Sequence, residues 1–229
     1  VVNSGTATLE TALIGCPQTA VYYIACSKWL AGVARQSAML KDASVDDIPN
    51  PIDAGVFSPM NKMEARRRFS IGQGKRVVLF GAANAADERK GFRYIAEALN
   101  ILNAMRPDYI GDIELLIFGK CSSECLDSLP FHCTMAGYLS SDADIVAAYS
   151  AADVYVTPSL EDNLPNTVME AMACSLPCVA FDTGGLPQLS GHLENGYLAR
   201  YKDAGDLAHG IDAVLGSPSI NGMRLSARR

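Results

Sequence analysis

The sequence contains no long apolar run. No apolar stretch approaches the roughly 18 to 20 residues that a helix needs to cross a bilayer, and no signal peptide is visible. It also has no excess of positive charge, because 19 lysines and arginines stand against 25 aspartates and glutamates, a net charge of −6. Phosphate contacts need clustered cations, so this balance argues against general nucleic-acid binding. We therefore expect at most peripheral membrane association and no nucleic-acid partner.

A disulfide framework is lacking as well. The seven cysteines are odd in number and scattered, which indicates reduced thiols in a cytoplasmic protein, with the inner face of the membrane as the alternative location. Cys121, Cys125, His132 and Cys133 offer atoms that bind metals, but their spacing fits no common structural zinc pattern. The sequence therefore predicts no metal site.

What the sequence does contain is an alternation of short apolar runs and stretches with helical periodicity. The expected strands are Val77–Phe80, Ile113–Phe118, Cys133–Met135, Asp153–Val156, Cys178–Phe181 and Gly196–Ala199. The expected helices are Asn61–Phe69, Phe92–Met105, Asp142–Ser150, one that begins near Asn166, and Asp206–Leu215. Such alternation predicts an α/β fold with a doubly wound, Rossmann-like parallel sheet.

A proline-rich segment, Ile48–Asp53, marks the expected domain boundary, because each proline restricts its own backbone and that of the preceding residue. Before it, Ser27 is expected to cap a helix whose apolar stripe runs from Trp29 to Leu40. We predict four parts. They are residues 1–24, a partial strand, helix and strand; residues 25–59, a helix and linker from the end of a missing first domain; residues 60–215, the Rossmann-like domain; and residues 216–229, a truncated tail.

The stretch from Pro158 to Gly185 combines a loop, a helix start and a buried strand. Its helix should present free N–H groups beside the carboxyl end of a strand, which is where α/β proteins bind phosphorylated ligands. Asp162 lies in the loop and Glu170 one turn inside the helix, so both carboxylates are expected to reach one crevice. The sequence therefore predicts an anion-binding site here.

The residue types in and near this stretch suit a nucleoside diphosphate. N–H donors are expected from the loop and helix start at Asn163, Leu164, Asn166 and Thr167. Lys90, with Arg89 beside it, follows another strand of the same sheet and supplies positive charge. Glu170 is able to accept hydrogen bonds from ribose hydroxyls. Each has a simpler explanation, since a lysine before a helix is usually solvated and an acid in the first turn often compensates the helix dipole.

The residues from about Cys26 onward resemble the retaining GT-B glycosyltransferases of family 4, group 1. The matching pieces are Ser27–Leu30, Ile48–Asp53, Val56–Phe57 with Pro59, Lys90–Gly91, Ala151–Val156 with Pro158–Ser159, Glu170–Ala173 and Gly184–Gly185. The resemblance implies that Lys90, Asp162 and Glu170 are catalytic. In this family pattern Lys90 would balance the charge of the diphosphate, Asp162 would contact the transferred sugar, and Glu170 would contact the ribose. The resemblance also implies a base site near the strand ends at Gly81, Gly119, Tyr138 and Leu139, and no cofactor or metal.

Some positions depart from the family pattern. The first acid is usually Glu but is Asp162 here, and Asn163–Pro165 replaces a loop of glycine, aromatic residue and glycine, with loss of backbone freedom and one N–H. An arginine expected soon after the first strand is absent, where Ala82–Asn84 stands. These changes leave the identity of the donor open.

Residues 1–24 resemble the donor-binding segment of lipid A disaccharide synthase, another GT-B enzyme. They also parallel a later part of the chain, because Glu10 precedes Pro17 by seven residues as Glu170 precedes Pro177. The resemblances imply transfer of a sugar from a nucleotide donor, expected to be UDP-linked, to an acceptor glycan or glycolipid. A nucleotide-sugar-binding module without turnover, or a GT-B epimerase, are the alternatives. The oligomeric state stays open.

Overall fold

The computed structural model describes residues 22–84, 87–121 and 126–228. Its main sheet has six strands: β3 (Arg76–Asn84), β4 (Ile113–Lys120), β5 (His132–Gly137), β6 (Val154–Thr157), β7 (Cys178–Phe181) and β8 (Gly196–Ala199). The strand order is β5-β4-β3-β6-β7-β8, and every neighbouring pair is parallel. The chain builds outward from β3 to β5 and then returns to the other side of β3. This confirms the predicted doubly wound α/β fold.

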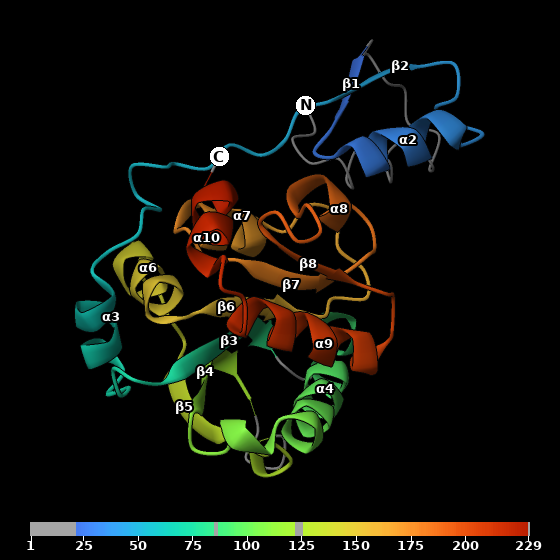
Figure 1. Cartoon of the computed structure of the whole chain (residues 1–229). Helices are drawn as coiled ribbons and strands as arrows, with labels where there is room; N and C mark the ends of the chain where they lie inside the picture. Colours follow the sequence, from blue (N-terminus) through green and yellow to red (C-terminus); the bar gives the residue numbers. More distant parts are fainter. Residues whose placement is uncertain (1–21, 85–86, 122–125, 229) are drawn as a thin grey trace.

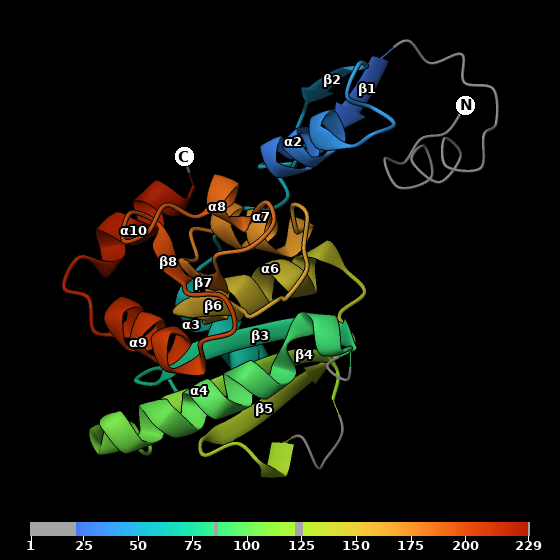
Figure 2. The same ribbon diagram turned by 90° about the vertical axis from the view of Figure 1, so that its right-hand side faces the viewer.

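Helices cover both faces of this sheet (Figures 1 and 2). The helices are α2 (Lys28–Gln36), α3 (Lys62–Arg68), α4 (Phe92–Met105), α6 (Asp142–Ala151), α7 (Asn166–Ala173), α8 (Leu186–Leu189), α9 (Ala204–Leu215) and α10 (Ile220–Ala227), with 3₁₀ turns η1 (Glu88–Lys90) and η2 (Pro107–Tyr109). α4 and α9 pack together on one face, while α3, α6 and α7 lie on the other (Figure 1).

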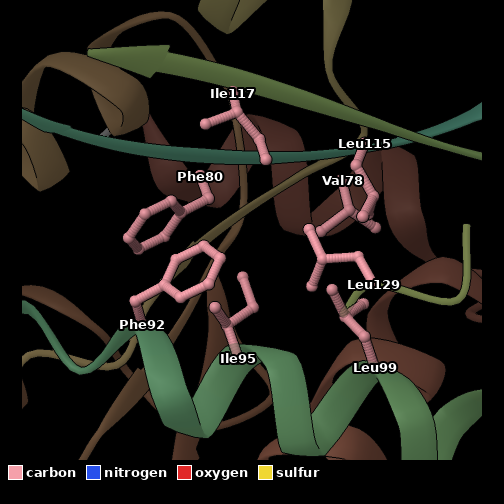
Figure 3. Close-up of a pocket in the computed structure, with 8 residues that line it drawn as sticks. All are labelled: Val78, Phe80, Phe92, Ile95, Leu99, Leu115, Ile117 and Leu129. Atoms are coloured by element: carbon pink, nitrogen blue, oxygen red, sulfur yellow. The ribbon is translucent and has the colours of Figure 1, made fainter. Parts of the chain in front are cut away.

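The alternation of side chains along the strands explains the two cores. In β3, Val78 and Phe80 point into the core beneath α4 and α9, whereas Val77 and Leu79 point to the opposite core. Both sets are buried, so the strand is apolar throughout, as expected for a central parallel strand. A small gap remains between α4 and the sheet, lined by eight apolar side chains (Figure 3). Its volume of about 10 Å³ is that of a packing defect.

A separate small unit precedes the main sheet. Strands β1 (Tyr22–Ala25) and β2 (Ser44–Asp47) pair in parallel, with α2 between them in sequence, and the three stand apart from the six-stranded sheet in both views (Figures 1 and 2). The predicted elements in residues 1–21 lie outside the described residues. Residues 48–61 connect this unit to α3 without a strand or helix.

The prediction that the first helix runs to Leu40 is wrong, because α2 ends at Gln36. Ser37 leaves the helical conformation there, and its hydroxyl donates to the Ala34 carbonyl and accepts from the Leu40 N–H. Ser37 thus replaces helical backbone bonds with side-chain bonds. The predicted apolar stripe is buried only in part: Ala34 and Leu40 lie in the core of the small unit, whereas Trp29 and Val33 are 48% and 47% exposed.

Residues Ile220–Ala227, near the C-terminus, form helix α10. α10 buries Met223 and Ala227, and its Arg224 donates to the Asp153 carboxylate at 2.8 Å. No helix in the described part of the chain is both long and apolar enough to cross a membrane.

Candidate functional site

A cleft lies where the strand order reverses. β3 and β6 are neighbours in the sheet but are followed by connections to opposite sides, a position where doubly wound proteins bind ligands beyond the strand ends. The cleft has a volume of about 530 Å³, within the range for small-molecule sites. Its lining residues come from α2 and from the loops after β3, β6 and β7: Trp29, Arg89, Lys90, Leu160, Glu161, Asp162, Asn163, Thr183 and Gly184.

The loops after β3 and β6 are bonded to each other. The Leu160 N–H donates to the Arg89 carbonyl at 2.7 Å. Gly91, at φ +69°, lets the two loops approach, because a Cβ there would lie 2.0 Å from the Pro158 carbonyl oxygen. This close approach needs glycine both for its conformation and for its missing side chain.

These two loops bring Lys90 and Asp162 together across 72 residues of sequence. Lys90 Nζ donates to Asp162 Oδ2 at 2.9 Å, and their side chains are 38% and 17% exposed. Arg89 lines the same cleft but pairs with Asp87 at 2.8 Å. The structure therefore places two predicted catalytic residues in one ion pair at the cleft wall.

Two glycines after β7 hold the Asp162 loop in place. The Gly185 N–H donates to the Asp162 carbonyl at 3.3 Å. Gly184 has φ +57°, and a Cβ on it would lie 1.9 Å from the same carbonyl oxygen. A Cβ on Gly185 would lie 1.7 Å from the Asn163 carbonyl oxygen. Thus the backbones of the two loops touch, and any side chain at either glycine would separate them.

The N-terminus of α7 lacks a capping side chain. Its N-cap residue is Pro165, which makes no side-chain cap. The Val168 N–H donates to the Pro165 carbonyl at 3.1 Å, so the N–H groups available to an anion are those of Asn166 and Thr167. Asn166 is exposed and accepts from the Asn50 side chain at 3.2 Å. The Leu164 side chain is buried, so only its backbone is able to contribute to a site.

The Asn163 side chain is turned toward the small N-terminal unit. Its Oδ1 accepts from the Ser27 hydroxyl, and its Nδ2 donates to Cys26 Sγ at 2.8 Å. Ser27 is fully buried and also caps α2 by accepting from the Leu30 N–H at 3.0 Å. These bonds connect the cleft loop to the start of α2.

Glu170 lies apart from the lining of this cleft, in contrast to the expectation that it shares a crevice with Asp162. Its Oε2 accepts from the Tyr149 hydroxyl at 3.0 Å. Partial burial raises the pKa of Glu170 above its usual value, with a further rise from Asp142, and the Tyr149 bond only partly offsets this. The Tyr149 ring packs edge-on against Phe118 and Tyr155, which fixes the hydroxyl beside the carboxylate.

The remaining predicted residues are not part of the cleft lining. Gly81 packs against Phe118, whose ring would lie 2.0 Å from a Cβ at that position. Gly119 is buried at the end of β4 with φ +99°, and Leu139 packs against the core. Tyr138, by contrast, is 75% exposed after β5. Thr167 lies beside the buried Tyr155 hydroxyl, which donates to the Gly81 carbonyl at 3.4 Å.

Sequence reasoning missed five lining residues: Trp29, Leu160, Glu161, Thr183 and Gly184. Gly184 carried a signal, because the Gly184–Gly185 pair follows a buried strand. Trp29 carried a weaker signal, since Ser27–Leu30 resembles the family but lies in a segment assigned to another part of the chain. Within the described ranges, no three His, Cys, Asp or Glu residues are grouped to hold a metal ion, and Cys125 lies outside those ranges.

The family pattern described as "Glycosyl transferases group 1" matches residues 74–217, which include the main sheet and its cleft loops. The chain belongs to this family.

Curated relatives of the chain are glycosyltransferases. It is 29% identical over 183 residues to a D-inositol 3-phosphate glycosyltransferase of Pseudarthrobacter chlorophenolicus, covering 76% of this chain and 43% of the relative. It is 26% identical over 188 residues to an Escherichia coli UDP-Gal:alpha-D-GlcNAc-diphosphoundecaprenol alpha-1,3-galactosyltransferase, covering 79% of this chain and 48% of the relative. The chain thus spans less than half the length of these curated relatives.

Solved structures share the fold. Sucrose-phosphate synthase from Thermosynechococcus elongatus superposes with a TM-score of 0.79 at 24% identity, covering 99% of this chain and 58% of the other. Anabaena HepE, solved with UDP and glucose, superposes with a TM-score of 0.73 at 20% identity, covering 99% of this chain and 62% of the other.

Proposed function

We propose that this chain is the donor-binding half of a retaining glycosyltransferase that uses a nucleotide-diphosphate sugar. The observation that carries the proposal is the Lys90–Asp162 ion pair in a cleft at the point where the strand order reverses. A cation beside an uncapped helix N-terminus suits a diphosphate, and a carboxylate suits sugar hydroxyls.

The donor would lie across the strand ends. Its diphosphate would bind the N–H groups at the start of α7 and Lys90, and its ribose would reach Glu170 on the same helix. The base would extend toward Gly119 and Tyr138, and the transferred sugar toward Asp162. One oxygen of Glu170 already accepts from Tyr149, so the other is the acceptor that remains for the ribose.

Lys90 would stabilise the leaving group. Transfer breaks the bond between the sugar C1 and the diphosphate oxygen and forms a bond from C1 to the oxygen of an acceptor hydroxyl. The hydroxyl proton is released to water, and the departing nucleotide carries the additional negative charge. A preorganised cation lowers the cost of that charge. Lys90 is now paired with Asp162, so donor binding would exchange this partner for phosphate oxygens and release Asp162 to accept from the sugar. In this proposal Lys90 supplies the positive charge without a metal or cofactor.

We propose UDP as the nucleotide and a glycan or glycolipid as the acceptor. HepE was solved with UDP, and the name of the E. coli relative includes a UDP-linked donor and a lipid-linked acceptor. A cytoplasmic site, or one at the inner face of the membrane, would suit such substrates. We also propose the division of the chain at residues 24, 59 and 215, and the likeness of residues 1–24 to lipid A disaccharide synthase.

The test combines calorimetry with a transfer assay. We expect UDP and at least one UDP-sugar to bind the purified chain, and Lys90→Ala to weaken UDP binding about tenfold, as for loss of one charge-assisted contact. Arg93→Ala is the matched control, because Arg93 is exposed on α4 outside the cleft lining. Failure of every nucleotide and nucleotide sugar to bind the wild-type chain would refute the proposal.

A nucleotide-sugar-binding module without turnover is the second candidate. Its support is the cleft itself, because the Lys90 cation and the uncapped start of α7 suit binding of a diphosphate and do not by themselves require transfer. Binding of a UDP-sugar with no glycosylated product, across a panel of glycan and lipid-linked acceptors, would select the module. Formation of product with retained anomeric configuration would select the transferase, and release of a free sugar epimer would identify an epimerase.

A further inference from the structure

We infer that Trp29 is a wall of the donor cleft that contacts the sugar part of the donor and sets its specificity. This inference rests on the proposed function. Trp29 lies on the first turn of α2, in the small unit before the main sheet, yet it lines the cleft together with Lys90 and Asp162. It is the single tryptophan of the sequence.

The position of Trp29 is held by bonds of the three residues that precede it in sequence. Ser27 and Cys26 bind the Asn163 side chain, and the Lys28 N–H donates to Gln188 Oε1 at 2.7 Å. Asn163 belongs to the loop after β6, and Gln188 to α8. The start of α2 is thus attached to one loop of the cleft and to α8, so the backbone that carries the indole is fixed beside the cleft.

The indole is available to a ligand. Trp29 is 48% exposed. Covering a large apolar side chain lowers the free energy, so a ligand that packs on the indole would be stabilised. Among the described residues that line the cleft it is the only aromatic one, and four of the other eight, Arg89, Lys90, Glu161 and Asp162, are charged. The cleft therefore combines one flat apolar surface with several charged groups.

This combination matches a pyranose better than it matches a diphosphate. A sugar ring has a face of C–H groups that packs on an aromatic ring and an edge of hydroxyls that bonds carboxylates. Trp29 and Asp162 both line the cleft, whereas Glu170, the proposed ribose contact, lies outside its lining. The donor part beside Trp29 is therefore the transferred sugar rather than the nucleoside.

The experiment compares nucleotide and nucleotide-sugar affinities in pairs. Dissociation constants for UDP and UDP-glucose, and for UDP and UDP-galactose, are measured by calorimetry on the wild-type chain, Trp29→Ala and Trp29→Phe. We expect Trp29→Ala to leave UDP affinity within about twofold and to weaken the better UDP-sugar about three- to tenfold. Trp29→Phe should retain most of the sugar affinity. Val33→Ala, equally exposed one turn later on α2, is the control for disturbance of the helix.

The outcomes separate this inference from the proposed function. Equal losses for UDP and UDP-sugar in Trp29→Ala would place the indole against the nucleotide and overturn the inference. No loss for either ligand, or equal wild-type affinities for UDP and every UDP-sugar, would also overturn it while the proposed function stands. Absence of any UDP binding to the wild-type chain would overturn both. Fluorescence gives a second readout, since UDP-sugar but not UDP should change the emission of the single tryptophan.

Discussion

The ion pair between Lys90 and Asp162 gives the cleft a nearly balanced charge before a ligand binds. Both side chains are partly exposed, so water screens the pair and its loss should affect stability little. Its importance lies in binding, because phosphate oxygens and the Asp162 carboxylate would compete for one ammonium group. Each residue thus has a partner that a donor would replace.

Neutralising Asp162 tests this competition. We expect Asp162→Asn to bind UDP about fivefold more tightly, because removal of one nearby negative charge in a water-exposed site changes the binding energy by ~1 kcal/mol. Sugar transfer, where it is measurable, should fall. Glu161→Gln removes the same charge from the adjacent cleft residue without breaking the Lys90 bond and should have a smaller effect. Calorimetry with UDP provides the comparison, and weaker UDP binding by Asp162→Asn would contradict the expectation.

We expect the Glu170 carboxylate to lower the stability of the fold at pH 7 and to favour binding of UDP. Its folded pKa is raised above the usual value, chiefly by burial, so its contribution to stability is full at pH below the unfolded value and is lost as the pH rises through the folded value. At pH 7 the ionised carboxylate therefore costs stability. We expect Glu170→Gln to raise Tm at pH 7 by on the order of 1–3 °C and to weaken UDP binding.

Thermal unfolding from pH 3 to pH 8 checks the sign. The advantage of Glu170→Gln should shrink below pH ~4, where the glutamate is protonated in the unfolded state as well. Glu97→Gln, at an exposed position of α4, is the control and should show no comparable pH dependence. A variant that is less stable than the wild type at pH 7 would show that the carboxylate is favourable there.

At the scale of elements, the cleft is a set of loops held by close backbone contacts. Leu160 bonds the Arg89 carbonyl, and the Gly184–Gly185 turn packs on the carbonyls of Asp162 and Asn163. The strands set where these loops begin, but the glycines set how near they come. A change at one glycine should therefore alter the site without altering the sheet.

Gly184→Ala tests the contact between the loops after β6 and β7. The alanine would adopt a left-handed conformation and place its Cβ against the Asp162 carbonyl, so the loops must separate. We expect a loss of about 1–3 kcal/mol in the free energy of unfolding and at least tenfold weaker UDP binding. Gly111→Ala is the matched control, because it has φ +84° but nothing within 4 Å of the added methyl group. Denaturant unfolding and calorimetry distinguish strain alone from displacement of the site.

At the scale of the whole molecule, Asp153 joins segments that are far apart in sequence. Its carboxylate accepts from Lys62 and Arg66 of α3, from the Val77 N–H of β3 and from Arg224 of α10. Burial opposes the charge, but the lysine, the amide and Arg66 outweigh it and lower the pKa of Asp153. Burial likewise lowers the pKa of Lys62, to about 8, against the attraction of Asp153.

Asp153→Asn should be strongly destabilising, because it leaves partly buried cations without their counter-charge. We expect a loss of about 3 kcal/mol, or roughly 6–12 °C in Tm. The wild-type contribution is present above the unfolded pKa of a carboxyl group and is lost as the pH falls through the lowered folded value, so the two proteins should converge in acid. Asp108→Asn, whose carboxylate is 61% exposed in its pair with Arg106, should change Tm little. Calorimetric scans across pH test both statements.

Much of the sheet could be predicted because local patterns carry it. β7, β8 and α4 have the predicted bounds, since apolar runs and helical periodicity are properties of neighbouring residues. The end of α2 could not be predicted in this way, because the Ser37 hydroxyl competes with helical bonds. Lys90 and Asp162 were also expected at one edge of the sheet, because parallel strands end on the same side.

The sequence by itself determined the α/β class, the alternation of strands and helices, and the residue types offered to a phosphorylated sugar. Only the tertiary structure decided which of them meet. It paired Lys90 with Asp162, bonded Glu170 to Tyr149, and brought Trp29 to the cleft through contacts with Asn163. Periodicity shows which side of an element is apolar, whereas a contact between residues more than a hundred positions apart depends on how whole elements pack.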